Sequence, residues 1–122
     1  KSNPRDTPSQ THILTLNPEI ERMRVRVGAM AFYAVEYVYN PAMTETMDEV
    51  RPTHRAFLSD LLDRGVNVAS GPLVGEVPGA LILISAESQD EVERILNEDP
   101  FYVAEVIQAR LIREWNPVIR VF

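Results

Sequence analysis

Two helix-forming segments set between strand-like segments are the feature that most limits how this chain can fold. The first, RPTHRAFLSDLLDRG at residues 51–65, carries apolar side chains at the three- and four-residue spacing of one buried helix stripe. We expect this helix to begin at Asp48 or Val50. Pro52 suits its first turn, and Gly65 suits the position just after its end.

A second helix is predicted after the capping box SQDE at residues 88–91. It should be broken at Asp99-Pro100, because proline disfavours helical geometry in the residue before it. The other regular segments are rich in β-branched, aromatic or apolar residues and are predicted to be strands. These four strands are residues 31–39, 66–70 (stopped by Gly71-Pro72), 80–86 and 106–115.

The resulting order, strand-helix-strand-strand-helix-strand, is typical of the ferredoxin-like split βαββαβ arrangement. This is an α+β fold in which an antiparallel sheet has both helices on one face. Two helices cover only one face of a four-stranded sheet, and the strands are apolar enough that the other face should meet a second apolar surface. We therefore expect a homodimer, or a higher oligomer of dimers, in which two sheets face each other.

Composition excludes several classes of function. A chain of 122 residues fits one domain, and it has no cysteine for a disulfide, a thiolate nucleophile or a cysteine zinc site. It also has no apolar run of roughly 18 residues that would make a transmembrane helix. Residues 30–122 carry seven Lys/Arg against fifteen Asp/Glu, a net charge of −8 that repels nucleic acid and anionic lipid. We expect a cytoplasmic protein with neither as a partner.

The first 29 residues differ from the rest. They hold three of the nine prolines and carry five Lys/Arg against three Asp/Glu, a net charge of +2. We interpret residues 1–29 as an N-terminal extension, either an arm that packs on the domain or a non-native addition, and residues 30–122 as the domain. Residues 23–27, MRVRV, alternate like a short edge strand, and His12 has no partner that the sequence identifies.

One titratable side chain sits where the buried face of the first helix should begin. His54 precedes Phe57 and Leu58 by one turn, so it shares their side of the helix. A histidine in this position is often a structural residue whose ring nitrogens are satisfied by the fold. It is also the position from which a ring can reach a neighbouring cleft, and the sequence alone leaves both interpretations open.

Three short motifs resemble those of the YCII-related (YciI-like) family. They are RPTH at residues 51–54, followed by Phe57-Leu58, then ASGP at residues 69–72 and EDPF at residues 98–101. The segment from Trp115 to Phe122 also resembles the C-terminal strand and tail of that family. The resemblance covers about residues 31–122 and leaves the first 29 unexplained. Residues 74–79 form a shorter loop than some relatives have, which affects the expected rim of the pocket.

The resemblance implies a ferredoxin-like dimeric α/β barrel whose active site is a His–Asp pair, here His54 and Asp99. A carboxylate bonded to one ring nitrogen would fix the tautomer and leave the other nitrogen as a proton acceptor. An aspartate before proline is also an ordinary turn former, so its functional role depends on His54. The few members with assigned chemistry include a dehydrochlorinase, and muconolactone isomerases are structural relatives.

Four further residues are predicted to bind substrate: Arg51, Ser70, Gly71 and Pro72. Arg51 could hold a substrate carboxylate with its guanidinium fork, or it could pair with Asp48 or Glu49 at the surface. Ser70 could donate a hydrogen bond to a ligand, or it could merely satisfy the end of its strand. The two histidines are far apart in sequence and no phosphate-binding loop or dinucleotide motif is present, so we expect no metal and no cofactor.

Three functions compete. The first is a cofactor-free lyase or isomerase that acts on a small, oxygenated, cyclic molecule with the His–Asp pair as general acid or base. The second is a non-catalytic small-molecule-binding or regulatory dimer module. The third is an oxygenase of the same wide fold group, in which His54 would ligate haem and would not need Asp99.

Overall fold

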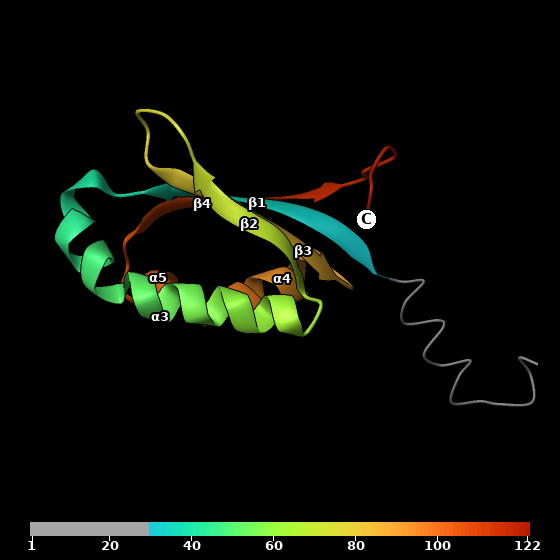
Figure 1. Ribbon diagram of the computed structural model, residues 1–122, viewed down its shortest axis with the longest axis horizontal. Helices are drawn as coiled ribbons and strands as arrows, with labels where there is room; N and C mark the ends of the chain where they lie inside the picture. The colour runs from blue at the N-terminus through green and yellow to red at the C-terminus, as the bar shows by residue number, and fades with distance from the viewer. Residues whose placement is uncertain (1–29) are drawn as a thin grey trace, which may run out of the picture. The chain divides into compact units, whose positions relative to one another are not determined.

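The computed structural model describes residues 30–122, in which four strands form one antiparallel sheet in the order β2-β3-β1-β4 (Figure 1). The elements are β1 (Ala31–Tyr39), the short 3-10 helix η1 (Pro41–Met43), α3 (Thr44–Asp63), β2 (Asn67–Leu73), β3 (Gly79–Ala86), α4 (Gln89–Leu96), α5 (Pro100–Val103) and β4 (Ile107–Trp115). This architecture confirms the predicted ferredoxin-like α+β fold. Residues 1–29, with the suggested strand at 23–27 and His12, lie outside the described residues.

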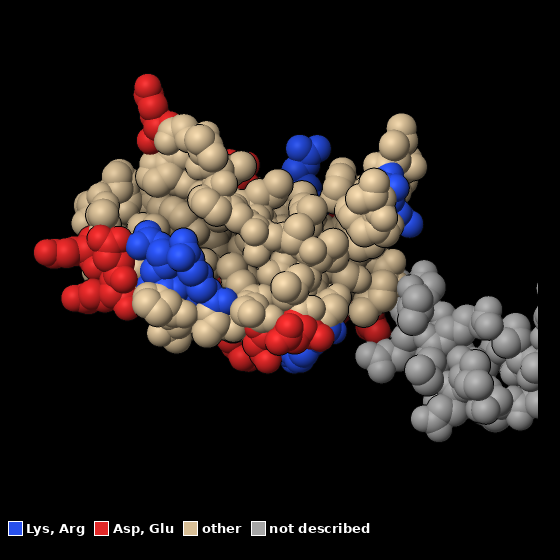
Figure 2. Space-filling model, in the orientation of Figure 1, with Lys and Arg blue, Asp and Glu red and all other residues tan. Residues whose placement is uncertain are grey.

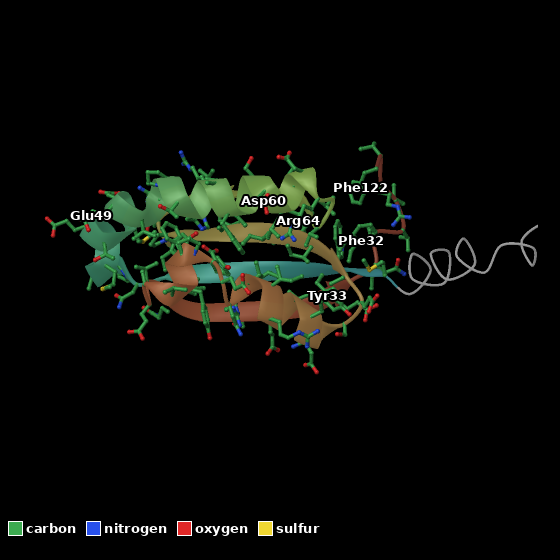
Figure 3. All side chains as sticks on the ribbon, turned by 90° about the horizontal axis from the view of Figure 1, so that it is seen from below. Phe32, Tyr33, Glu49, Asp60, Arg64 and Phe122 are labelled. Atoms are coloured by element: carbon green, nitrogen blue, oxygen red, sulfur yellow. The ribbon has the colours of Figure 1, made fainter. Side chains whose placement is uncertain are left out.

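The helices α3, α4 and α5 lie on one face of the sheet, as Figure 3 shows from the helix side. Alternate residues of β1 and β3 point toward these helices and are buried, which is the period of two expected of a half-covered sheet. The helices contribute the matching apolar stripes, so one core forms between the two layers. Its largest fully buried apolar side chains are Tyr37, Leu61, Ile82, Ile84, Leu96 and Phe101.

The helix α3 is longer than the sequence indicated. It begins at Thr44 and not at Asp48 or Val50, and Pro52 lies inside it and not in its first turn. The extra turns are stabilised because Met47 is buried in the core. A proline inside a helix cannot donate to the preceding turn and usually bends it, and Figure 1 shows the first turns of α3 at an angle to the rest. Gly65 follows the helix end with φ +77°, as predicted.

The strand β2 also exceeds its prediction. It runs to Leu73 and so continues through Gly71-Pro72, which were expected to stop it after residue 70. The reason is topological: within residues 30–122, β2 is an edge strand paired only with β3, and an edge strand tolerates a proline whose missing N–H would face away from the sheet. The other three strands agree with prediction to within one residue.

The second predicted helix ends before Pro100, as expected, and a further short helix follows the break. Ser88 caps α4, its side chain accepting a hydrogen bond from the Glu91 backbone N–H, and α4 ends at Leu96. After Asp99 the chain forms the single-turn helix α5, which the sequence did not indicate. The Asp99 side chain caps this turn by accepting from the Phe101 backbone N–H.

The face of the sheet away from the helices carries large apolar side chains on both sides of the exposed Glu36, which pairs with Leu81 and with Leu111. Leu81, Leu111 and Trp115 remain 38–53% exposed there. At one end Phe122 returns over this sheet and packs edge-on against Phe32, with ring centroids 5.5 Å apart (Figure 3). No helix within residues 30–122 has the length and hydropathy needed to cross a bilayer.

Candidate active site

The structure brings His54 and Asp99 into direct contact. His54 lies in the middle of α3 and Asp99 at the start of α5, 45 residues apart in the chain, yet Nδ1 of the ring and Oδ1 of the carboxylate are 2.8 Å apart. The histidine is 6% exposed and the aspartate is fully buried. A buried carboxylate is stable only when it is well hydrogen-bonded, so the surroundings of Asp99 decide what the pair can do.

Asp99 accepts hydrogen bonds on both oxygens. Oδ1 accepts from the backbone N–H of Phe101 at 2.9 Å in addition to His54, and Oδ2 accepts from the hydroxyl of Tyr37 at 2.9 Å. These three donors come from α3, α5 and β1, so the carboxylate connects both layers of the fold. An ionised carboxylate accepts and cannot donate, so a neutral ring beside it would carry its proton on Nδ1 and present Nε2 as the acceptor.

The plane of the imidazole is fixed by a second contact. His54 stacks on the ring of Phe101 at a centroid distance of 3.9 Å and an interplanar angle of 9°. Because Nδ1 is held by Asp99, both the position and the rotation of the ring are determined. Within residues 30–122 no group forms a hydrogen bond to Nε2, and this nitrogen is therefore free to meet a ligand.

A pocket of about 530 Å³ lies between α3 and β2, which is a volume typical of sites for small molecules. His54 is part of its wall. The apolar wall residues are Leu58, Leu62, Ala69, Pro72, Ala80, Ile82 and Phe101, and the polar ones besides His54 are Tyr39, Arg51, Arg55, Ser59, Asn67 and Ser70, with Gly71 between them. In the described part of the chain, no cluster of three or more His, Asp or Glu side chains is placed to hold a metal ion.

The predicted substrate-binding residues Arg51, Ser70, Gly71 and Pro72 all line this pocket. Arg51 also makes the alternative contact, because its Nη1 lies 2.7 Å from Oδ1 of Asp48. The extension of β2 through Gly71-Pro72 is what carries the Ser-Gly-Pro motif along the pocket wall. The roles of these four residues in binding stay predictions.

Asn67 is a buried site residue that the sequence reasoning missed. Its Nδ2 donates to the backbone carbonyl of Leu58 and to Oγ of Ser70, each at 3.0 Å. The carbonyl of Leu58 can only accept, which fixes the orientation of the amide. Among the described residues no donor reaches Oδ1 of Asn67, and this atom is buried. An asparagine at the start of a strand gave no signal beyond ordinary turn chemistry.

Tyr37 is the second residue that was missed, since its aromatic neighbours made it look like ordinary core. Burial raises the pKa of the Tyr37 phenol, and the nearby Asp99 carboxylate raises it further. Burial also raises the pKa of Tyr39 to about 12. Both phenols are therefore protonated at neutral pH, and Tyr37 acts as a hydrogen-bond donor to Asp99 and not as a base.

Comparison with known proteins agrees with this fold. A model of the YCII-related domain family matches residues 31–116. No curated protein matches the chain in sequence. Among solved structures, the fold is similar to 5-chloro-2-hydroxyhydroquinone dehydrochlorinase from Burkholderia phenoliruptrix, determined in complex with 2,5-dihydroxybenzoquinone, with a TM-score of 0.63 and 22% identity over 70% of this chain and 93% of that one. The family match spans most of the chain, and the protein belongs to the YCII-related domain family.

Proposed function

We propose that this protein is a cofactor-free lyase or isomerase of small molecules, in which His54 is the general acid/base and Asp99 orients it. The observation that carries the proposal is the 2.8 Å contact between Nδ1 and a fully buried carboxylate, which leaves Nε2 as the unbonded nitrogen of a ring that lines a ligand-sized pocket.

The chemistry follows from the tautomer. Nε2 of neutral His54 takes a proton from a substrate carbon, and the Asp99 carboxylate stabilises the imidazolium that forms. In an elimination, the electron pair of the broken C–H bond forms a double bond, and the leaving group departs with its own pair. In an isomerisation, the imidazolium returns the proton to a different carbon. A positioned acid/base of this kind typically contributes about 10²- to 10⁴-fold in rate.

The comparisons support the proposal at the level of fold. The similar solved structure is a dehydrochlorinase, so one protein with this fold carries out an elimination on an oxygenated ring. At 22% identity this likeness does not transfer the substrate. The absence of cysteine is compatible with the cytoplasmic location that we propose for the enzyme.

We also propose that the protein is a homodimer formed through the open face of its sheet. Leu81, Leu111 and Trp115 lie on this face with more than a third of their surface exposed, and large apolar side chains exposed on a sheet face are typical of a protein interface. Sedimentation of the wild-type chain should give twice the monomer mass of 13.8 kDa. Leu111→Glu, which places a charge on the face without touching the core, should give the monomer. A wild-type chain that sediments as a monomer would contradict this proposal.

The catalytic proposal is tested by comparing the wild type with His54→Gln, a neutral side chain of similar reach. The assay follows chloride release from chlorinated hydroxyhydroquinones, and deuterium incorporation into cyclic lactones and hydroxylated rings in D₂O. We expect His54→Gln to lower turnover at least about 10²-fold. The control Arg64→Gln should keep full turnover, because Arg64 pairs with Asp60 outside the pocket (Figure 3).

The outcomes separate the candidates. Equal turnover by wild type and His54→Gln would refute the acid/base role. Binding of these compounds without turnover of any of them would instead support the ligand-binding module. Spectral changes on adding haem that vanish in His54→Gln would support the oxygenase.

A further inference from the structure

We infer that the pocket selects small cyclic compounds that carry a negative charge, and that Arg55 is the residue that holds this charge. The inference deepens the proposed function, on which it rests for the identity of the site. It comes from the charges, donors and apolar surfaces of the pocket wall and not from the His–Asp pair.

The pocket is positive within an acidic domain. Residues 30–122 contain fifteen Asp and Glu, yet none of them is among the residues that line the pocket, whereas two of the seven arginines, Arg51 and Arg55, are. Figure 2 shows a basic patch over the first half of α3, with an uncharged surface above it toward β2. A cleft of one sign raises the local concentration of ligands of the opposite sign.

The two arginines are not equivalent. They lie one helical turn apart on α3, but Arg51 already pairs with Asp48 at 2.7 Å. Within the described residues, Arg55 has no acidic partner within ion-pair distance and no hydrogen-bond acceptor. The guanidinium of Arg55 therefore keeps its full set of donors for an anion, which it can bind through two parallel hydrogen bonds.

The opposite wall offers a second donor. Asn67 donates its amide N–H to Oγ of Ser70, and its own position is fixed by the carbonyl of Leu58. The hydroxyl proton of Ser70 must then point away from Asn67, and in residues 30–122 no group accepts it. Both polar anchors are donors, so the matching ligand presents oxygen acceptors: an anionic one at Arg55 and a carbonyl or hydroxyl oxygen at Ser70.

The apolar residues of the pocket wall indicate what the uncharged part of the ligand should be. Leu58, Ile82 and Phe101 line the pocket between these two anchors, and Phe101 stacks on the imidazole. A compact hydrocarbon body such as a ring buries apolar surface against such a wall. Cyclic carboxylates and ring oxyanions combine this body with the required charge, and the wall would hold them beside Nε2 of His54.

The test measures binding and is independent of turnover. Two carboxylate–carboxamide pairs, 4-hydroxybenzoate with 4-hydroxybenzamide and cyclohexanecarboxylate with its amide, are titrated by heteronuclear NMR, together with 2,5-dihydroxybenzoquinone. Each is measured against the wild type, Arg55→Gln, Arg51→Gln, Ser70→Ala, His54→Gln and the control Arg64→Gln. The last removes the same charge from the end of α3 outside the pocket.

We expect the wild type to bind each carboxylate about fivefold more tightly than its amide, because Arg55 is exposed and water screens part of its attraction for an anion. Arg55→Gln should reduce this preference to within about twofold. Arg51→Gln should reduce it much less, since Asp48 already neutralises its charge, and Arg64→Gln should leave it intact. Ser70→Ala should weaken both members of a pair alike, by about threefold to tenfold.

Three results would overturn the inference: no carboxylate binds, amides bind as tightly as carboxylates, or the preference survives Arg55→Gln. A preference that disappears in Arg51→Gln instead would overturn the assignment to Arg55. The proposed function is tested separately by His54→Gln, which should lose turnover while it keeps the preference for anions. A wild-type chain that turns over substrate but shows no preference for carboxylates would therefore contradict only this inference.

Discussion

Replacing Tyr37 by phenylalanine tests whether the buried Asp99 carboxylate is held by the fold as the structure indicates. The change removes one hydroxyl group, which donates to Oδ2 of Asp99 at 2.9 Å, and leaves the aromatic ring in the core. No other described donor reaches Oδ2, and Asp99 is fully buried, so water cannot replace the lost bond without opening the fold.

The magnitude follows from the charge of the acceptor. A hydrogen bond to a charged group contributes about 1.5–3 kcal/mol to stability, and a buried acceptor left unpaired loses that amount in full. We therefore expect Tyr37→Phe to lower the free energy of unfolding by about 2–3 kcal/mol. This is a large share of the roughly 5–15 kcal/mol that stabilises a typical domain.

The chain offers a matched control two residues away. Tyr39 lies on the same strand and the same face and is similarly buried, but within the described residues its hydroxyl forms no hydrogen bond. Tyr39→Phe should therefore change stability by less than about 1 kcal/mol. Urea denaturation of both variants gives the comparison. Equal losses, within about 0.5 kcal/mol, would refute the view that Tyr37 anchors the carboxylate.

Further predictions concern pH, packing and capping. The pKa of Tyr39 is raised from about 10 to about 12 in the folded state, so its contribution to the free energy of unfolding is fully present below pH 10 and is lost as the pH rises toward 12. Between pH 10 and pH 12 the stability of Tyr39→Phe should therefore fall less steeply than that of the wild type. Urea midpoints that fall in parallel for the two chains would contradict the raised pKa. Gly79→Ala should destabilise the sheet by about 1–3 kcal/mol, because its Cβ would clash with the backbone carbonyl of Tyr37, and an unchanged thermal midpoint would argue against this close approach. Ser88→Ala should cost about 1 kcal/mol by removing the cap of the Glu91 N–H, whereas Ser88→Asp should restore it; equal stability of all three chains would exclude a capping role.

The order of strands and helices was predictable because the local patterns were strong. The strand at 31–39 and the capped helix after Ser88 are set by residue type and spacing within a few positions. The errors arose where tertiary context outweighs local preference. Pro52 is accommodated inside α3 because the core buries Met47 beyond it, and Pro72 is accommodated in β2 because that strand lies at the edge of the sheet.

The candidate site was predictable only in part. His54 and Asp99 came from motifs that resemble a family, and their distance could be judged only once the two helices were placed in space. Tyr37 and Asn67 had no local signal, because a tyrosine in a strand and an asparagine after a turn are ordinary in sequence. Their importance comes from partners 62 residues and 9 residues away, which only the folded structure brings together.

Asp99 combines a structural role with the catalytic role that we propose for it. The same carboxylate starts α5, anchors β1 and orients the imidazole of α3. Loss of activity in an Asp99 variant would thus say little about the proposed reaction, because the backbone around Asp99 would also be disturbed. The same coupling bears on natural divergence: a lineage that abandoned the reaction would still be selected to retain the aspartate. Under the proposed mechanism, the imidazole and not the aspartate would distinguish active relatives from inactive ones.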